Sequence, residues 1–187
     1  MSRTGSTSKK EPFVTWMLFG IPILIAVAYP IHLLYEWTGK NIVAGLFAPV
    51  NESMWEHLKM VFWPTLFWWA IGYLIFLRNR GNGFARAAVT CAVSALVSEV
   101  FVIAFFYTYT GALGVESLTV NIIGLFLGLF FGILLARHID RHTKPRKFAT
   151  FIAVVLILLL AAAFLYFTFT PPHLPIFKDP PTGRFGI

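Results

Sequence analysis

The chain contains five apolar stretches, each about as long as a lipid bilayer is thick. A helix needs about 20 predominantly apolar residues to cross roughly 30 Å of hydrocarbon. The stretches that meet this length are residues 13–37, 53–77, 84–109, 118–137 and 148–170. We therefore predict an all-α polytopic membrane bundle of five transmembrane helices over residues 13–170, with a cytoplasmic basic tail (1–12) before it and a proline-rich tail (171–187) after it.

Composition excludes the soluble classes of protein. Charged residues make up 12% of the chain, whereas soluble domains carry about 25%. The net charge is +7, but the basic residues form short clusters between the apolar stretches rather than one patch. We therefore predict no nucleic-acid partner and expect the lipid bilayer to surround the chain.

The basic residues also predict orientation, because cytoplasmic loops retain an excess of Lys and Arg. With the N-terminus inside, eleven of the fifteen basic residues are cytoplasmic: Arg3, Lys9, Lys10, Arg78, Arg80, Arg86, Arg137, Arg141, Lys144, Arg146 and Lys147. The other four, Lys40, Lys59, Lys178 and Arg184, are then outside. We predict that the N-terminus and the solvated loop 138–147 are cytoplasmic and that the C-terminus is extracytoplasmic.

The segment 48–59 carries the strongest local signal for a site. Ser53 followed by Glu56 has the form of a capping box, which predicts a helix that begins at 51–53. Its first turns present Glu52 and Glu56 at i and i+4, with His57 beside them. Acidic residues also favour the N-terminus of any helix through its dipole. At the start of a membrane helix, however, two carboxylates and an imidazole suit a cation, a metal or proton transfer.

A second pair of polar residues stands near the outer end of the first helix, where His32 and Glu36 are one turn apart. Histidine nitrogen and carboxylate oxygen from two elements are the ligands that zinc takes in proteins. We therefore predict a divalent metal such as zinc as a candidate cofactor, with hydrogen bonding at the interface as the alternative. The candidate ligands are His32, Glu36, Glu52, Glu56, His57 and His173.

Glu99 lies deep in the third apolar stretch, about ten residues from its outer end. A carboxyl group at that depth is costly in hydrocarbon and marks a functional site by default. We expect Ser94, Ser98 and Asn121 to supply its partners, and the alternative is a neutral Glu that packs helices together. Glu52, Glu56, Glu99 and Asn121 are the candidates for ligand binding or a proton relay.

Two further features are expected to be structural. Gly124, Gly128 and Gly132 recur every four residues, a pattern that lets helices approach closely. We expect this stripe to pack within one chain rather than against a second copy or another membrane protein. The tail 171–187 is expected to lie over the outer mouth as a stiff lid that brings His173 and Asp179 towards the cluster.

The segments Pro49-Val50-Asn51-Glu52-Ser53 and Trp55-Glu56-His57-Leu58-Lys59, the turn 107–111 and the Pro-Pro-His tail together resemble a family of small bacterial membrane proteins classed as a domain of unknown function. The resemblance covers nearly the whole chain and implies the bacterial cytoplasmic membrane, but no activity. Ser53 and His57 are also faintly similar to the zinc site of membrane hydrolases related to alkaline ceramidases.

Three classes of function follow from these residues. The first is an outward-facing Glu/His site that binds a cation, a proton or a small polar ligand, and we place it first. The second is a metal-dependent hydrolase that acts on a lipid or its headgroup. The third is an accessory subunit that holds a membrane-protein partner or forms a homo-oligomer.

Overall fold

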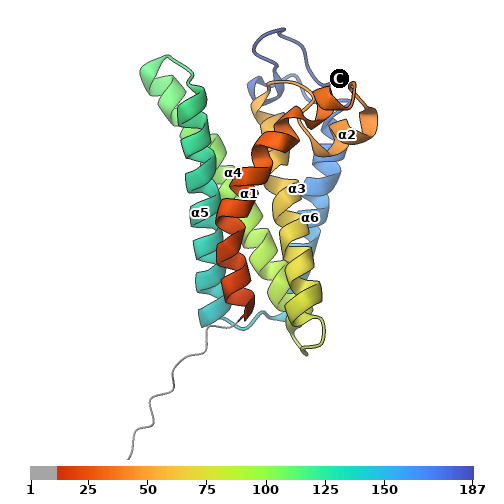
Figure 1. Ribbon diagram of the computed structural model, residues 1–187, viewed down its shortest axis with the longest axis vertical. Helices are drawn as coiled ribbons and strands as arrows, with labels where there is room; N and C mark the ends of the chain where they lie inside the picture. Colours follow the sequence, from red (N-terminus) through yellow and green to blue (C-terminus); the bar gives the residue numbers. More distant parts are fainter. Residues whose placement is uncertain (1–11) are drawn as a thin grey trace, which may run out of the picture.

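The computed structural model describes residues 12–187, so the predicted basic tail lies outside the described residues except for Pro12. Five long helices run alongside one another (Figure 1): α1 Pro12–Trp37, α3 Met54–Gly72 with its π-helical extension η1 Tyr73–Leu77, α4 Gly83–Leu113, α5 Leu118–His142 and α6 Lys147–Phe167. Each is long and apolar enough to cross a membrane. The prediction of an all-helical chain with five such helices is confirmed, and residues 12–187 contain no β-strand.

Two connections differ from the prediction. The segment 38–51 contains a short helix, α2 Ile42–Phe47, which begins after Asn41 because the Asn41 side chain accepts a hydrogen bond from the Val43 N–H at 2.8 Å. The prediction of a loop at 138–142 is wrong, because these residues form the last turn of α5. The Asp140 carboxylate in this turn pairs with the Arg86 guanidinium of α4, so the charge is satisfied within the bundle.

The helix α4 is the centre of the bundle and contacts α3, α5 and α6, while α1 packs against α3 and α5. The ends of α1 and α6, the start of α3, α2 and the tail 171–187 gather at one end, the upper end in Figure 1. The short turns 78–82 and 143–146 lie at the opposite end. We call the first of these the tail end of the bundle.

A reciprocal pair of tryptophans fixes α1 against α3. The Trp16 indole N–H donates to the Trp68 carbonyl at 3.0 Å, and the Trp68 indole N–H donates to the Trp16 carbonyl at 3.2 Å. The two rings stack with centroids 3.9 Å apart. Gly20 and Gly72 make this possible, because a Cβ on either would stand 2.7 Å or less from the nitrogen of the opposite indole.

The glycine stripe on α5 lies against α4, within the same chain. A Cβ at Gly128 would stand 2.9 Å from the Ser98 carbonyl oxygen, and one at Gly124 would stand 2.5 Å from the Phe105 ring. The Ser98 hydroxyl uses the close approach to donate to the Gly128 carbonyl at 3.0 Å. The three glycines therefore serve the contact between α4 and α5.

This contact predicts that Gly132→Ala lowers stability. The new methyl group would meet the Ser94 carbonyl oxygen at 2.6 Å, so the helices must separate. Overpacking of this kind costs about 1–3 kcal/mol. The control is Gly111→Ala in α4, where the space around the glycine is open and alanine favours the helix by about 1 kcal/mol. Thermal unfolding in detergent should show a lower midpoint for Gly132→Ala only, and equal midpoints would contradict the assigned packing.

Candidate functional site

The site begins where the chain turns into α3. Ser53 is the N-cap, and its hydroxyl accepts from the Glu56 N–H at 3.3 Å, so the predicted start of this helix is confirmed. The Asn51 side chain accepts from the Ser53 N–H at 2.9 Å. The Glu56 carboxylate reaches back past the cap and accepts from the Val50 N–H at 3.1 Å. Side-chain acceptors therefore hold the backbone of residues 50–53, which precede the helix, and of its first turn.

Lys59 is fully buried and ties this turn to two other elements. Its ammonium group lies 2.6 Å from the Glu56 carboxylate and also donates to the Gly45 carbonyl at 2.8 Å and to the Thr168 hydroxyl at 2.7 Å. An ammonium group has three N–H donors, so each one has a partner. Glu56 is itself buried, and its charge is balanced by this ammonium. The pair therefore joins α2, α3 and the end of α6.

The tail 171–187 is bound to the same turn. The buried Asp179 carboxylate accepts from the Glu52 N–H at 2.9 Å and from the Thr182 hydroxyl and N–H. The Asn51 amide donates to the Gly186 carbonyl at 3.0 Å. Phe177 completes the contact by packing on the Trp55 ring with centroids 4.9 Å apart. The tail therefore packs on the turn that precedes α3, and the Asp179 carboxylate contacts the backbone of Glu52.

Three side chains converge on this turn from separate parts of the chain: His32 from α1, Glu52 from the turn and His57 from α3. The Glu52 carboxylate oxygens lie 3.4 Å from His57 Nε2 and 3.8 Å from His32 Nε2. The two imidazole rings stack with centroids 5.2 Å apart. One ligand atom from each residue lies within 4.8 Å of the other two, a spacing that admits a metal ion.

The hydrogen bonds of the cluster determine which atoms face inwards. His57 Nδ1 lies 2.8 Å from the Ser53 carbonyl oxygen, which only accepts, so this nitrogen carries a proton and donates. His57 Nε2 then faces the Glu52 carboxylate. The neighbouring His57 imidazole holds the pKa of Glu52 below its ordinary value despite partial burial. Glu52 is therefore an anion at neutral pH, with about half of its side chain exposed.

Glu36, His173 and Asn121 do not join the three side chains that converge, and each has other partners. Glu36 forms an exposed ion pair with Lys40 at 3.5 Å, and His173 is exposed and packs on the Phe185 ring. Asn121 accepts from the Tyr109 hydroxyl and donates to Glu116 at 3.1 Å, which ties the α4–α5 turn together.

Glu99 is buried in α4, and no hydrogen-bond partner for its Oε1 occurs among residues 12–187. The serines expected beside it are engaged differently. Ser98 donates to Gly128, and the Ser94 hydroxyl has no partner in the described part of the chain. The Trp69 indole N–H of α3 donates to the Thr90 hydroxyl of α4, so these two residues lie at the same level along the bundle. Glu99 follows Thr90 along α4 by about as many residues as Lys59 precedes Trp69 along α3. At about 1.5 Å per residue, Glu99 therefore lies roughly level with Lys59.

A family model described as a family of unknown function, DUF6512, matches residues 6–187. The chain belongs to the DUF6512 family. No curated protein and no solved structure matches it. The resemblance to a family of unknown function is thus confirmed, and membership in DUF6512 assigns no activity to the cluster.

The buried role of Lys59 in this DUF6512 chain does not follow from the sequence. The sequence indicates Lys59 only as one of the basic residues outside the membrane, whereas its side chain is buried against Glu56. The spacing of Glu56 and Lys59 at i and i+3 was a usable signal, because residues three apart face each other on a helix. The partners Gly45 and Thr168 carry no such signal, because tertiary structure alone brings them to Lys59.

The buried pair predicts that Lys59→Met strongly destabilises the fold. The substitution leaves the Glu56 carboxylate buried without its cation, a loss that costs about 3–5 kcal/mol. Adding Glu56→Gln to Lys59→Met should recover much of the loss, because the uncompensated charge is removed. Lys40→Met, which breaks the exposed pair with Glu36, should cost at most about 1 kcal/mol. Unfolding midpoints of the four proteins in detergent measure these differences, and a Lys59→Met protein as stable as wild type would contradict the assigned role.

Proposed function

We propose that this chain is an integral membrane protein that binds a divalent transition metal, best matched by zinc, through His32, Glu52 and His57. The single observation that carries the proposal is the approach of these three side chains to one another. A neutral imidazole Nε2 and a carboxylate both present lone pairs, which repel at 3.4 Å unless a cation lies between them. Either a proton or a metal ion meets that need.

The chemistry of the three residues favours a metal ion. Zinc binds His nitrogen and Glu oxygen at about 2.0–2.2 Å, so ligand atoms around a tetrahedral ion lie roughly 3.3–3.6 Å apart. The distance of 3.4 Å from Glu52 Oε2 to His57 Nε2 already falls in this range, and the distance of 3.8 Å from Glu52 Oε1 to His32 Nε2 is slightly longer. His57 also donates its other ring N–H to a backbone carbonyl, as metal-binding histidines commonly do.

The number of ligands supports a second candidate function, a metal-dependent hydrolase. Catalytic zinc sites have three protein ligands and an open fourth position, whereas structural sites have four. A water molecule at the open position is activated as a nucleophile. In a hydrolase of this kind, a carboxylate acts as the general base for that water. The substrate class at this end of the bundle would be a lipid headgroup.

We further propose that the tail end of the bundle is extracytoplasmic, in the cytoplasmic membrane. Support comes from the distribution of basic residues: the turns 78–82 and 143–146, at the opposite end, hold Arg78, Arg80, Lys144 and Arg146. Cytoplasmic segments next to membrane helices carry this excess.

The metal proposal predicts about one zinc ion per chain after purification without chelators. His57→Ala and Glu52→Gln should each lower zinc affinity by more than the roughly 10–100-fold that loss of an outer hydrogen-bond partner costs. His173→Ala and Glu36→Gln are the matched controls, because these residues lie outside the cluster. Elemental analysis and competition with a zinc indicator measure the two quantities.

Thermal unfolding gives an independent measurement of zinc binding. A metal bound by the folded state raises the unfolding midpoint, so added zinc should stabilise wild type and both control variants but not His57→Ala or Glu52→Gln. A wild-type protein with no zinc and no response to it would contradict metal binding and leave a proton between the side chains.

The orientation proposal predicts the compartment of each end. A reporter that is active only in the cytoplasm should give signal when fused after Gly83, which follows the basic turn 78–82, or after Thr143, which follows Arg137 and Arg141 at the end of α5. The same reporter fused after Ile187 should be silent. Signal from the C-terminal fusion would overturn the proposed orientation.

A further inference from the structure

A basic pocket of about 160 Å³ lies on the last turns of α5. This is the end of the bundle opposite the tail end, at the bottom of Figure 1. The lining residues recur every three or four positions, which puts them on one face of the helix. They are Leu134, Arg137, His138, Arg141 and His142. The proposed metal site lies at the other end of the bundle, so this inference does not depend on a metal ion.

The face that carries the pocket points away from the bundle. Gly132 marks the face of α5 that packs on α4, whereas His138 and Arg141 are exposed. One to two turns earlier, the exposed side chains of α5 are apolar, as at Phe131 and Leu135. The exposed surface of this helix therefore changes from apolar to basic at the pocket. In a bundle that spans a membrane, that change marks the level where hydrocarbon gives way to headgroups.

No carboxylate of the described chain neutralises the two arginines of the pocket. Asp140 is the only acidic residue of α5, and it pairs with Arg86 of α4. Within residues 12–187, neither Arg137 nor Arg141 forms an ion pair. A guanidinium group is a planar fork that binds phosphate oxygens through two parallel hydrogen bonds. The pocket therefore offers positive charge and, at the exposed Arg141, accessible N–H donors to an anion.

The other lining residues make the pocket partly apolar. The His138 and His142 rings stack with centroids 4.3 Å apart, and Leu134 lies one turn nearer the middle of the helix than the arginines. A free phosphate ion gains nothing from an apolar wall. A phospholipid gains from both parts, because its chains lie along the apolar surface of α5 while its phosphate reaches the arginines.

We propose that this pocket binds the phosphate group of an anionic phospholipid, with Arg137 and Arg141 as the donors. Basic pockets on the cytoplasmic side of membrane helices bind anionic headgroups in this way. Phosphatidylethanolamine also carries a phosphate, but the same arginines repel its ammonium group. The pocket therefore selects a headgroup with net negative charge, such as phosphatidylglycerol.

The test is native mass spectrometry of the full chain with equal amounts of dioleoyl phosphatidylglycerol and dioleoyl phosphatidylethanolamine. We expect wild type to retain one phosphatidylglycerol per chain with about a tenfold preference. Arg137→Gln combined with Arg141→Gln should remove the preference. The control is Arg78→Gln combined with Arg80→Gln, which removes the same charge at the same end but outside the pocket, and it should keep the preference. Equal loss in the two double variants would show a general effect of charge and overturn the proposal.

A second pair of variants tests the pocket without any change of charge. Leu134→Trp fills the pocket and should lower retention of phosphatidylglycerol about fivefold. Leu135→Trp makes the same change at the next residue, which is exposed and lies outside the pocket, and should retain the lipid like wild type. Equal retention by these two variants would contradict the assigned location. If the double arginine variant does not fold, this comparison decides the question.

Inorganic phosphate distinguishes a lipid from a free ion as the ligand. Added inorganic phosphate should not displace phosphatidylglycerol, because the lipid also contacts the apolar surface beside the pocket. Complete displacement would indicate a site for a free ion and overturn the assignment to a lipid. Removal of zinc with a chelator should leave lipid retention unchanged, because the two sites lie at opposite ends of the bundle. The failure of either proposal is thus visible without the other.

Discussion

The buried pair of Glu56 and Lys59 is the interaction on which the tail end of the bundle depends. A charge in the interior is tolerated only when its donors or acceptors are satisfied, and here the partners come from α2, from the turn before α3 and from the end of α6. The same turn carries Glu52, and the chain after Thr168 carries the tail that binds it. The Glu56–Lys59 ion pair therefore holds the turn that carries Glu52 in position, although neither residue belongs to the candidate metal site.

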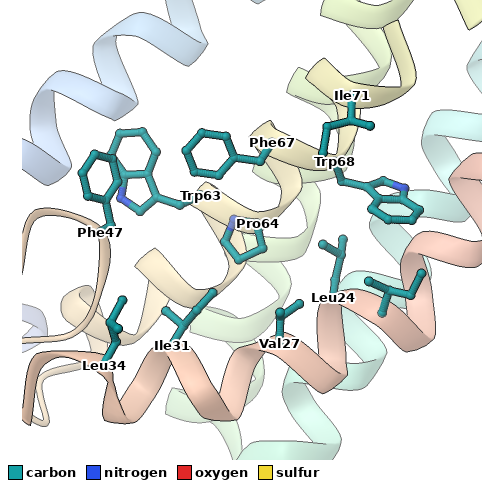
Figure 2. A pocket seen from close by; sticks show the side chains of 11 residues that line it. Leu24, Val27, Ile31, Leu34, Phe47, Trp63, Pro64, Phe67, Trp68 and Ile71 are labelled. Atoms are coloured by element: carbon teal, nitrogen blue, oxygen red, sulfur yellow. The ribbon is translucent and has the colours of Figure 1, made fainter. Parts of the chain in front are cut away.

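The helices α1 and α3 each contribute residues both to the polar cluster and to an apolar groove that lies between them (Figure 2). α1 contributes His32 to the polar cluster and Ile31 to the apolar groove, while α3 contributes His57 to the first and Trp63 to the second. A helix places successive residues about 100° apart, so adjacent residues face different surroundings. The stacked Trp16 and Trp68 hold the two helices together further along, and Trp68 also lines the groove.

The helices were predictable because hydrophobic length is a local property of the sequence, and the start of α3 was predictable because Ser53 and Glu56 form a local cap. The end of α5 was not predictable in this way. Asp140 lies in its last turn and pairs with Arg86, a residue 54 positions away in the sequence. The cluster was predicted in part: His32, Glu52 and His57 meet, whereas Glu36 and His173 do not. The sequence spacing of Glu36 and His173 allowed them to join the cluster. The rotation of α1 and the path of the tail, which are tertiary properties, decide which side chains face the turn before α3.

Three carboxyl groups near the tail end show why Glu52 is the one suited to a cation. Glu56 is buried, and its charge is already balanced by Lys59. Glu99 stands roughly level with Lys59, but the three donors of that ammonium are used elsewhere. Glu52 alone combines partial exposure with two imidazoles and a backbone N–H fixed by Asp179. Its oxygens are held in place yet still accessible from solvent, and a ligand that must exchange a bound ion requires both properties.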